Sequence, residues 1–393
     1  MVDPLKFRDI DPGPRVLMGP GPSDVSNRVL QAMAAPCIGH LDPYFLEIMD
    51  ETQKLIRYLF QADYPLAIPI SGTGSAGMET CFVNLIEPGD KVLVCVNGVF
   101  GTRMSDIVSR IGGDLIRLDF PWGRAVDPQV VREEARRTNP GIIAVVHAET
   151  STGACTRLDE MSSVAQEVEA LFLVDTVTSL GGMPVNVAEH RIDAAYSGTQ
   201  KCISCPPGLS PVIMSPRALN RLNERNTAVV SWYLDMGMVG SYWGKERKYH
   251  HTAPINMIYA LREALRIIAE EGMEKRFTRH KTNHLALVAG LEAMGLSMLV
   301  PEKERLPMLN TVIIPEGAND VQVRTILLKE YNIEIGGGLG ELAGKVWRIG
   351  LMGTSCTRRN VVLFLGALYT ILKGIGADVK PGALEAASEV YDG

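Results

Sequence analysis

The stretch ISGTGSAGME, residues 70–79, spaces three glycines in the pattern G-x-G-x-x-G. It follows the apolar run LAIPI and precedes a segment of helical composition that ends at the turn of residues 88–90. A strand that turns into a helix through small residues exposes backbone N–H groups at the helix N-terminus, which suits an anion. A tight turn with Ser75 as the helix cap explains the same letters. The stretch therefore predicts a strand–turn–helix unit and leaves its ligand open.

A dinucleotide-binding fold would place an acidic residue at the end of the second strand, where it binds the ribose hydroxyls. The expected second strand, residues 91–96, is followed by Asn97 and Gly98 instead. The expected first strand also begins late, after an arm and a helix. Both observations disfavour a nicotinamide or flavin site.

Composition and charge narrow the class of protein. The chain has 393 residues, of which 46% are hydrophobic and 21% charged, with a net charge of −6. Because the basic residues are scattered, we expect neither a nucleic-acid nor a membrane partner. The first residues lack the apolar core of a signal peptide, and no apolar run approaches the ~18 residues that span a bilayer. Seven cysteines at irregular spacing fit reduced thiols, so we expect a cytoplasmic protein.

Apolar runs alternate with helical patterns over the first two thirds of the chain. Expected strands lie at residues 91–96, 141–147, 171–175 and 193–198. Between two of them, a helix should begin with Asp127 as its cap and Pro128 at its first position. Such short aliphatic strands are typical of a parallel sheet buried on both faces. The sequence predicts an α/β fold with a mainly parallel sheet sandwiched by helices.

The pattern changes near residue 272, where a long helix leads into a mixture of strands and helices. We expect an N-terminal arm over residues 1–22, a large domain over residues 23–272 and a smaller α+β domain over residues 273–393. Residues 225–255 lack clear periodicity and concentrate aromatic and basic residues. Long irregular loops of this kind are more often functional or interfacial than not.

A second signal comes from two charged residues at expected strand ends, Asp175 in LFLVD and Lys201 in YSGTQKC. In open α/β sheets, ligands bind beyond the carboxyl ends of the strands. A plain salt bridge would explain an isolated Asp and Lys. Asp175, however, ends a wholly apolar run and needs a cationic partner, and Lys201 lies in a loop of small residues. An anion cradle, a strand-end carboxylate and a strand-end amine together are what pyridoxal 5′-phosphate requires.

Several longer motifs carry a family resemblance. They are VDTVTSLGG (residues 174–182), AAYSGTQKCISCPPG (194–208), HAETSTG (147–153), KYHHTAP (248–254) and KVWRIGLMG (345–353). In order and spacing the chain resembles the class V aminotransferases of the pyridoxal-phosphate fold type I, most of all the alanine–glyoxylate (serine–pyruvate) aminotransferases. The resemblance runs from MGPGPS, residues 18–23, to the last helix.

The resemblance implies a role for each matching residue. Lys201 would hold the cofactor covalently and move the substrate proton, and Asp175 would keep the ring nitrogen protonated. Thr73, Gly74, Ser75 and Gln200 would bind the phosphate. Phe100 would stack on the ring where the relatives have tryptophan, so the indole donor is lost.

Further contacts follow from the same resemblance. Thr150 would contact the cofactor and Val177 the opposite ring face. Tyr249 and Thr252 would reach the phosphate of the neighbouring subunit, which implies a homodimer with shared active sites. Arg348 would bind the substrate α-carboxylate as a bidentate fork, and the backbone near Gly21 would close the side of the small substrate.

Other chemical motifs are weaker. The C-x-x-C of Cys202 and Cys205 stands alone and reads as packing, and no metal site is expected. His280 and His284 lack the Glu of H-E-x-x-H, which favours a solvated helix face. The side chains of the neighbours His250 and His251 should diverge.

The expected activity is transfer of an amino group from a small amino acid, alanine or serine, to glyoxylate, giving glycine and a 2-oxo acid. Serine–glyoxylate, ureidoglycine–glyoxylate and aminoethylphosphonate transamination remain open. A cysteine desulfurase-like lyase would need a nucleophilic cysteine on a mobile loop, for which Cys356 is the candidate. A non-enzymatic regulator would need a DNA-binding module that the 393 residues do not offer.

Overall fold

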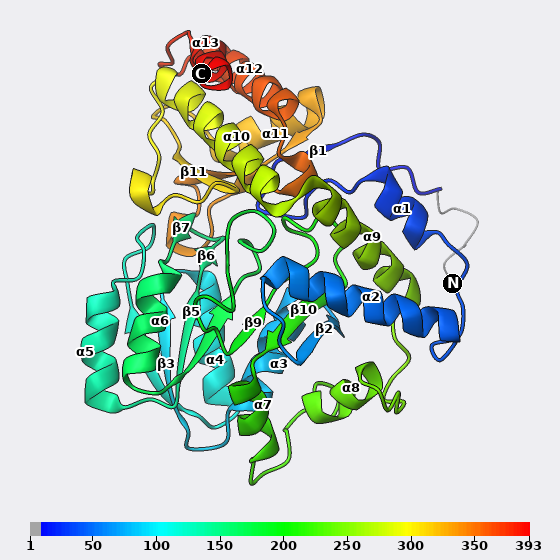
Figure 1. Ribbon diagram of the computed structural model, residues 1–393. Helices are drawn as coiled ribbons and strands as arrows, with labels where there is room; N and C mark the ends of the chain where they lie inside the picture. The colour runs from blue at the N-terminus through cyan, green and yellow to red at the C-terminus, as the bar shows by residue number, and fades with distance from the viewer. Residues whose placement is uncertain (1–8) are drawn as a thin grey trace, which may run out of the picture.

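A seven-stranded sheet forms the centre of the larger part of the molecule in the computed structural model, which describes residues 9–393 (Figure 1). In spatial order its strands are β2 (Leu66–Ser71), β10 (Leu209–Met214), β9 (Ala194–Tyr196), β8 (Leu171–Asp175), β5 (Ile142–Val146), β3 (Lys91–Val96) and β4 (Asp114–Asp119). Strand β10 is antiparallel to both neighbours, and the other neighbouring pairs are parallel. The predicted mainly parallel sheet is confirmed. Residues 1–8 of the expected arm lie outside the described residues.

Helices cover both faces of this sheet. They include α2 (Pro43–Phe60), α3 (Gly74–Leu85), α4 (Val99–Arg110), α5 (Pro128–Thr138), α6 (Leu158–Glu167) and α7 (Pro216–Asn223). Helix α5 begins as predicted, with the Asp127 carboxylate accepting the Gln129 N–H at 2.9 Å. The alternative of Ser75 as the cap of α3 is wrong. The chain turns at Gly72, with φ of 154°, so the helix starts after Thr73 and Ser75 lies inside its first turn.

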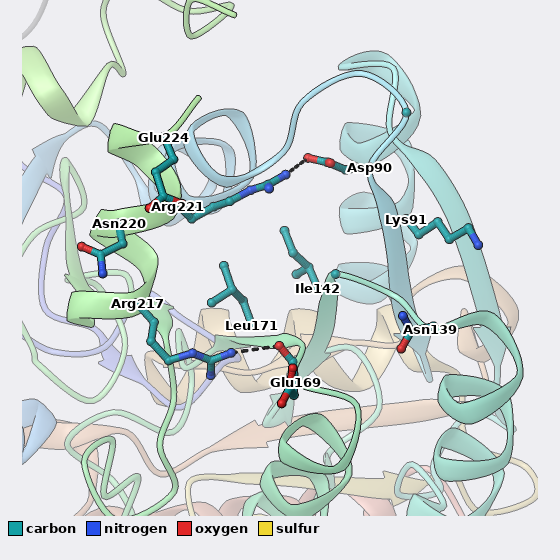
Figure 2. A pocket seen from close by; sticks show the side chains of 12 residues that line it. Asp90, Lys91, Asn139, Ile142, Glu169, Leu171, Arg217, Asn220, Arg221 and Glu224 are labelled. Carbon is teal, nitrogen blue, oxygen red and sulfur yellow. Dashed lines mark hydrogen bonds and ion pairs between the residues drawn. The ribbon is translucent and has the colours of Figure 1, made fainter. Parts of the chain in front are cut away.

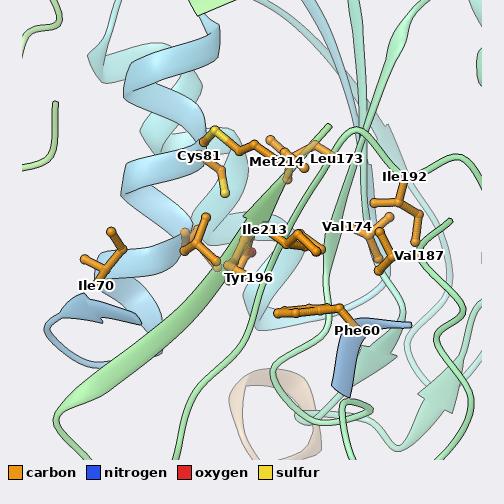
Figure 3. Packing of buried hydrophobic residues seen from close by; sticks show 14 of the residues in the cluster. Phe60, Ile70, Cys81, Leu173, Val174, Val187, Ile192, Tyr196, Ile213 and Met214 are labelled. Atoms are coloured by element: carbon orange, nitrogen blue, oxygen red, sulfur yellow. The ribbon is translucent and has the colours of Figure 1, made fainter. Parts of the chain in front are cut away.

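The packing of α3 on the sheet requires a glycine. A Cβ at Gly77 would lie 1.9 Å from Ser210 Oγ and 3.1 Å from Tyr196 Cβ, so the helix axis can approach the strands only without a side chain there. Figure 3 shows Cys81 of α3 and Tyr196 on one side of β10, and Phe60 with Val174 on the other. The third glycine of the G-x-G-x-x-G pattern thus sets the distance between helix and sheet.

A second, smaller unit has its own core. Its sheet joins β11 (Leu309–Ile313), β14 (Val346–Gly350) and β13 (Gly336–Gly337) in antiparallel pairs. Helices α10 (Met273–Ala293), α11 (Asp320–Tyr331), α12 (Arg358–Gly374) and α13 (Ala383–Asp392) surround it, and α9 (Ile255–Glu271) leads into it (Figure 1). This agrees with the α+β composition expected there. The domain boundaries at residues 22 and 272 stay a prediction.

The N-terminal segment connects the two units. Strand β1 (Val16–Leu17) pairs in parallel with β12 (Ile333–Glu334), and Met18 is buried in the second core. The chain then crosses to the large sheet, where the Ser23 hydroxyl donates to the Lys201 carbonyl at 2.7 Å. Helix α1 (Asn27–Met33) follows and packs on α9.

Two histidine expectations are wrong. His280 and His284 lie on the buried side of α10, where Nδ1 of His280 is 2.8 Å from the Arg276 carbonyl and Nε2 accepts the Gly353 N–H at 3.0 Å. The buried stripe of α10 has helical spacing but contains polar residues, so its polarity suggested a solvated face. The rings of His250 and His251 also meet instead of diverging, with their Nδ1 atoms 2.8 Å apart, because the chain there is neither helix nor strand.

The irregular region at residues 225–255 holds one more helix than expected, α8 (Met236–Trp243), which begins at an Asp235 cap. Across residues 9–393, none of the helices combines the length and the apolar character that a bilayer crossing demands.

Candidate active site

The parallel sheet brings the predicted site residues to one edge. Strands β2, β3, β5, β8 and β9 all run the same way, so the segments that follow them meet beyond their carboxyl ends. A cavity of about 120 Å³ opens there. It is lined by Thr73, Gly74, Ser75, Met78, Phe100, Arg103, Asp175, Val177, Gln200 and Lys201. Eight of these residues were predicted from the sequence; Met78 and Arg103 were not.

Asp175 is a buried carboxylate at the end of β8. It accepts the Val177 N–H and the Tyr196 hydroxyl, both at 2.8 Å. The register of β8 and β9 explains the second bond, because Asp175 and Tyr196 are direct partners on neighbouring strands. Burial raises the pKa of Asp175 to about 7, against the lowering effect of these two hydrogen bonds. The two hydrogen bonds therefore offset only part of the cost of burying the carboxylate.

Lys201 lies close to Asp175 and is also buried. Burial, and then the nearby Arg348 guanidinium, lower the pKa of its amine to about 8. A substantial share of the amine is therefore neutral near neutral pH, which is the form that attacks carbonyl carbon. Nζ donates to the Pro20 carbonyl, and a Cβ at Gly21, whose φ is 105°, would lie 2.6 Å from Nζ. Gly21 thus packs directly against the lysine.

The small-residue turn forms another wall of the cavity. The first N–H groups of α3 have no acceptor within the helix. A Cβ at Gly74 would lie 3.4 Å from Val177 Cγ2 and 3.5 Å from Gly198 Cα, so the turn sits close to the segment that follows β9. Gln200 faces the same space, and its Oε1 is buried without a hydrogen-bond partner. The donors at this corner are the first N–H groups of α3, whereas the Gln200 Oε1 is an acceptor.

Arg348 reaches the site from β14 of the second unit. Its Nε donates to the Gly337 carbonyl at 2.8 Å and its Nη1 to the Thr150 carbonyl at 3.0 Å. Within the described chain, its guanidinium makes no ion pair with a carboxylate. Burial lowers its pKa to about 10. A buried, oriented guanidinium without an anion is a receptor for a small carboxylate.

Thr150 is buried at the same edge, with its hydroxyl bonded to that of Thr178. Tyr249 and Thr252 do not line the cavity of their own chain. Tyr249 is 54% exposed, and its hydroxyl lies 3.4 Å from Thr252 Oγ1. The structure therefore groups the other predicted residues and leaves these two on the surface.

Two residues that support the site were missed in the sequence. Tyr196 could have been found because it ends the strand next to Asp175. Glu149, in HAETSTG, is fully buried and accepts the N–H groups of Ser151 at 3.0 Å and Phe100 at 3.2 Å. It caps the first turn of α4, whose own cap residue, Gly98, has no side chain. Neither contact has a sequence pattern of its own, because each joins segments distant in the chain.

Burial makes the thiols of three cysteines, Cys202, Cys205 and Cys356, unreactive. Burial raises the thiol pKa of Cys202 to about 11 and those of Cys205 and Cys356 to about 12. The interpretation of Cys202 and Cys205 as packing residues agrees with their burial. Cys356 is buried beside the start of α12, which does not suit a nucleophile on a mobile loop. Residues 9–393 contain no cluster of three or more His, Cys, Asp or Glu side chains arranged to hold a metal.

A roomier cavity, of about 490 Å³, lies at the opposite edge of the sheet, where β3, β5 and β8 begin (Figure 2). Its arginines are already occupied. Arg217 pairs with Asp193 at 3.0 Å and donates to the Glu169 carbonyl at 2.9 Å, and Arg221 pairs with Asp90. The smaller cavity, which is lined by Asp175 and Lys201 and has Arg348 near that lysine, is therefore the better candidate.

Known proteins resemble the chain over nearly its whole length. The family model Aminotransferase class-V matches residues 19–351. A (S)-ureidoglycine–glyoxylate transaminase of Bacillus subtilis (strain 168) is 40% identical and covers 96% of this chain and 95% of its own. An alanine–glyoxylate aminotransferase of Drosophila melanogaster is 37% identical, with 93% and 94% covered. The crystal structure of an alanine–glyoxylate aminotransferase from Nostoc sp. superposes with a TM-score of 0.91 at 48% identity, over 95% of this chain and 99% of that one.

The burial of Asp175 predicts a pH-dependent cost in the protein freed of bound small molecules. The unfolded carboxyl ionises near 3.8, whereas the folded one keeps its proton up to about 7. The folded state thus binds the extra proton between these values, and this group lowers the free energy of unfolding as pH rises through them. Asp175→Asn removes the effect. The stability of the variant relative to wild type should rise by roughly 2–4 kcal/mol between pH 4.5 and 7.5 in urea unfolding.

Asp63→Asn is the control, because that carboxylate is fully exposed. Its stability difference from wild type should be the same at both pH values. A difference for Asp175→Asn that is also independent of pH would show that the buried carboxylate carries no such cost.

Proposed function

The chain belongs to the class-V aminotransferase family, and from that premise we propose that it moves the amino group of alanine or serine to glyoxylate, giving glycine and a 2-oxo acid. It is an aminotransferase that uses pyridoxal 5′-phosphate. The observation that carries the choice of acceptor is that the three relatives described above, each matched over more than nine tenths of the chain, are named for glyoxylate.

The residues at the sheet edge fit this cofactor. The buried Asp175 carboxylate suits the protonated ring nitrogen, and the Lys201 amine near it suits the aldehyde. The α3 N-terminus, with Thr73, Gly74, Ser75 and Gln200, provides donors for the phosphate. Phe100 lines the cavity with an aromatic face, and Val177 lines it with an aliphatic one. Thr150 would contact the cofactor from the same edge.

The cofactor, when bound, supplies an aldehyde that takes up the amino group and a ring that holds the electron pair left by the α-proton. The side chains of the protein move the proton and hold the charge of the ring. Lys201 Nζ takes that proton from the α-carbon and later returns it to the cofactor side, for which a pKa of about 8 suits work near neutral pH. Asp175 stays ionised beside the ring nitrogen, because a neighbouring cation lowers the pKa of its carboxyl.

Arg348 orients the substrate. Its fork, held by the carbonyls of Gly337 and Thr150, would bind the α-carboxylate shared by the amino donor and by glyoxylate. The backbone at Gly21 lies against Lys201 and limits the space on that side. A narrow acceptor site agrees with a two-carbon oxo acid.

Ureidoglycine is a second candidate donor. The (S)-ureidoglycine–glyoxylate transaminase of Bacillus subtilis is as similar to this chain as the alanine–glyoxylate enzymes are. A donor with a urea group needs hydrogen-bond partners that alanine does not, so the two donors differ in what the pocket must offer.

Steady-state assays with glyoxylate and a panel of alanine, serine and ureidoglycine test the function. We expect kcat/KM for alanine or serine to exceed that for ureidoglycine by at least about 10-fold, which is ~1.4 kcal/mol of transition-state binding. Arg348→Lys should lower kcat/KM for every donor by about 100-fold, since the bidentate contact is lost. Arg324→Lys, at a residue that pairs with Asp320 outside the cavity, is the control.

A preference for ureidoglycine would favour the second candidate. If no donor transfers its amino group to glyoxylate while pyruvate accepts it, the proposed acceptor is wrong. Release of sulfide from cysteine would instead support the lyase reading.

We propose that the enzyme is a homodimer with shared active sites. Tyr249 and Thr252 are exposed and away from the cavity of their own chain. Beside them, the exposed rings of Trp232 and Tyr233 pack against His250 and His251, and Val230 and Met238 are exposed in the same 225–255 region. Apolar residues gathered in this way are typical of a protein interface. From this surface, Tyr249 and Thr252 would reach the phosphate in the neighbouring subunit.

Mixed dimers test this arrangement. Lys201→Ala and Tyr249→Ala would each disable a site, but from different subunits. Refolding the two inactive variants together should restore activity, because one site in each mixed dimer has both native residues. Mixing that restores nothing, or an enzyme that sediments as a monomer at working concentration, would contradict the shared site.

A cytoplasmic location is also a proposal. The seven cysteines are free, and five of them are buried, as suits a reducing compartment. Cell fractionation that finds the activity exported or bound to membranes would contradict it.

A further inference from the structure

Arg103 is a cation at the cavity for which neither the sequence motifs nor the relatives' names provide a role. It lies on α4, one turn beyond Phe100, and lines the cavity. Its Nη1 donates to Ser75 Oγ at 2.9 Å, and its guanidinium carbon lies 5.1 Å from the centroid of the Phe100 ring. Over the described residues, Arg103 forms no ion pair with an acidic side chain.

An exposed arginine is ordinary by itself, since most arginines are solvated. Arg103 differs in where its guanidinium is held. One N–H group of the guanidinium donates to Ser75, in the first turn of α3. The other N–H groups have no acceptor among residues 9–393. The α3 N-terminus carries the positive end of the helix dipole at the same place. Two positive features thus meet at Ser75, and within residues 9–393 the guanidinium is not paired with a carboxylate.

The base of α4 is rigid, which makes the position of Arg103 reproducible. The Val99 N–H donates to Ser151 Oγ at 3.0 Å and the Phe100 N–H to Glu149 Oε2 at 3.2 Å. Glu149 is fully buried, and Ser151 Oγ donates to it at 2.5 Å. One helical turn therefore presents an aromatic ring and a guanidinium to the same cavity from a fixed start.

We propose that Arg103 binds the phosphate of the cofactor, together with the α3 N-terminus. A dianion would be neutralised by a guanidinium fork that approaches it from α4, while the N–H groups of α3 approach it from the turn. Helix α4 would then hold the cofactor twice, by Phe100 at the ring and by Arg103 at the phosphate. The inference rests on the proposed place of the phosphate at Thr73, Gly74 and Ser75.

The test compares two ligands of the cofactor-free enzyme, pyridoxal 5′-phosphate and pyridoxal, which lacks the phosphate. Dissociation constants come from absorbance and fluorescence titrations without substrate. Arg103→Gln should weaken binding of the phosphorylated ligand by about 10-fold or more and change pyridoxal binding less than about twofold. The affinity of Arg103→Lys for the phosphorylated ligand should be intermediate between those of wild type and Arg103→Gln. Arg110→Gln, on the same helix at a residue paired with Asp106, should behave as wild type.

Inorganic phosphate gives an independent readout. It should raise the melting temperature of the cofactor-free wild type and raise it less in Arg103→Gln. Urea unfolding of each variant without ligand shows whether the fold is kept.

Three results would overturn the proposal. Equal weakening of both ligands would mean that Arg103 acts through the Phe100 ring. Unchanged binding of both ligands would mean that it makes no contact with the phosphate, and a changed KM for the amino donor alone would assign it to the substrate. The variant Ser75→Ala tests the proposed position of the phosphate independently of the role of Arg103. If that variant loses phosphate-dependent affinity and Arg103→Gln does not, only the inference about Arg103 fails; if neither loses it, the phosphate place is wrong too.

Discussion

The site depends on one electrostatic constraint, a carboxylate that is buried at the end of a parallel strand and, within residues 9–393, is held by hydrogen bonds and by no ion pair. Asp175 is held by the Val177 N–H and by the Tyr196 hydroxyl, its partner on the next strand. These bonds fix its direction, but burial still raises its pKa to about 7. Such a group favours a bound cation over water, and the ring nitrogen of the cofactor provides one. Burial of the Asp175 carboxylate thus lowers the stability of the fold and raises the affinity of the site for a cation.

The backbone arranges the other groups around this carboxylate. Because six of the seven strands run the same way, the residues after them converge at one edge without any long-range sequence signal. Glycines then set the close distances: Gly77 lets α3 approach the sheet, and Gly21 lets the N-terminal segment touch Lys201. The second unit contributes Arg348, anchored to the Thr150 carbonyl across the interface. Burial, and then the nearby Arg348 guanidinium, lower the pKa of the Lys201 amine that must act as a base.

Much of this was predictable because the signals are local. Strand composition and the Asp127 cap indicated the fold. The glycine-rich turn and the strand-end positions of Asp175 and Lys201 indicated the place of the site, and the family resemblance added Phe100, Val177 and Gln200. What stayed hidden depends on contacts between distant segments. Tyr196 meets Asp175 only through strand register, Glu149 caps a helix that begins fifty residues earlier in the chain, and Arg103 meets Ser75 only when α3 and α4 stand side by side. The prediction for His280 and His284 failed because polar side chains suggested a solvated helix face. Both rings are in fact buried, and they bond to the Arg276 carbonyl of α10, to Gly353 and to Asn310.

The most direct test of the account is chemical trapping of the cofactor. Borohydride reduction of the enzyme with bound pyridoxal 5′-phosphate, followed by peptide mass analysis, should place one label per chain on Lys201, and Lys201→Ala should take up none. Asp175→Asn should keep the site of labelling but bind the cofactor more weakly, because the ring nitrogen loses its counter-charge. A label on another lysine, or equal labelling of Lys201→Ala, would contradict the central claim.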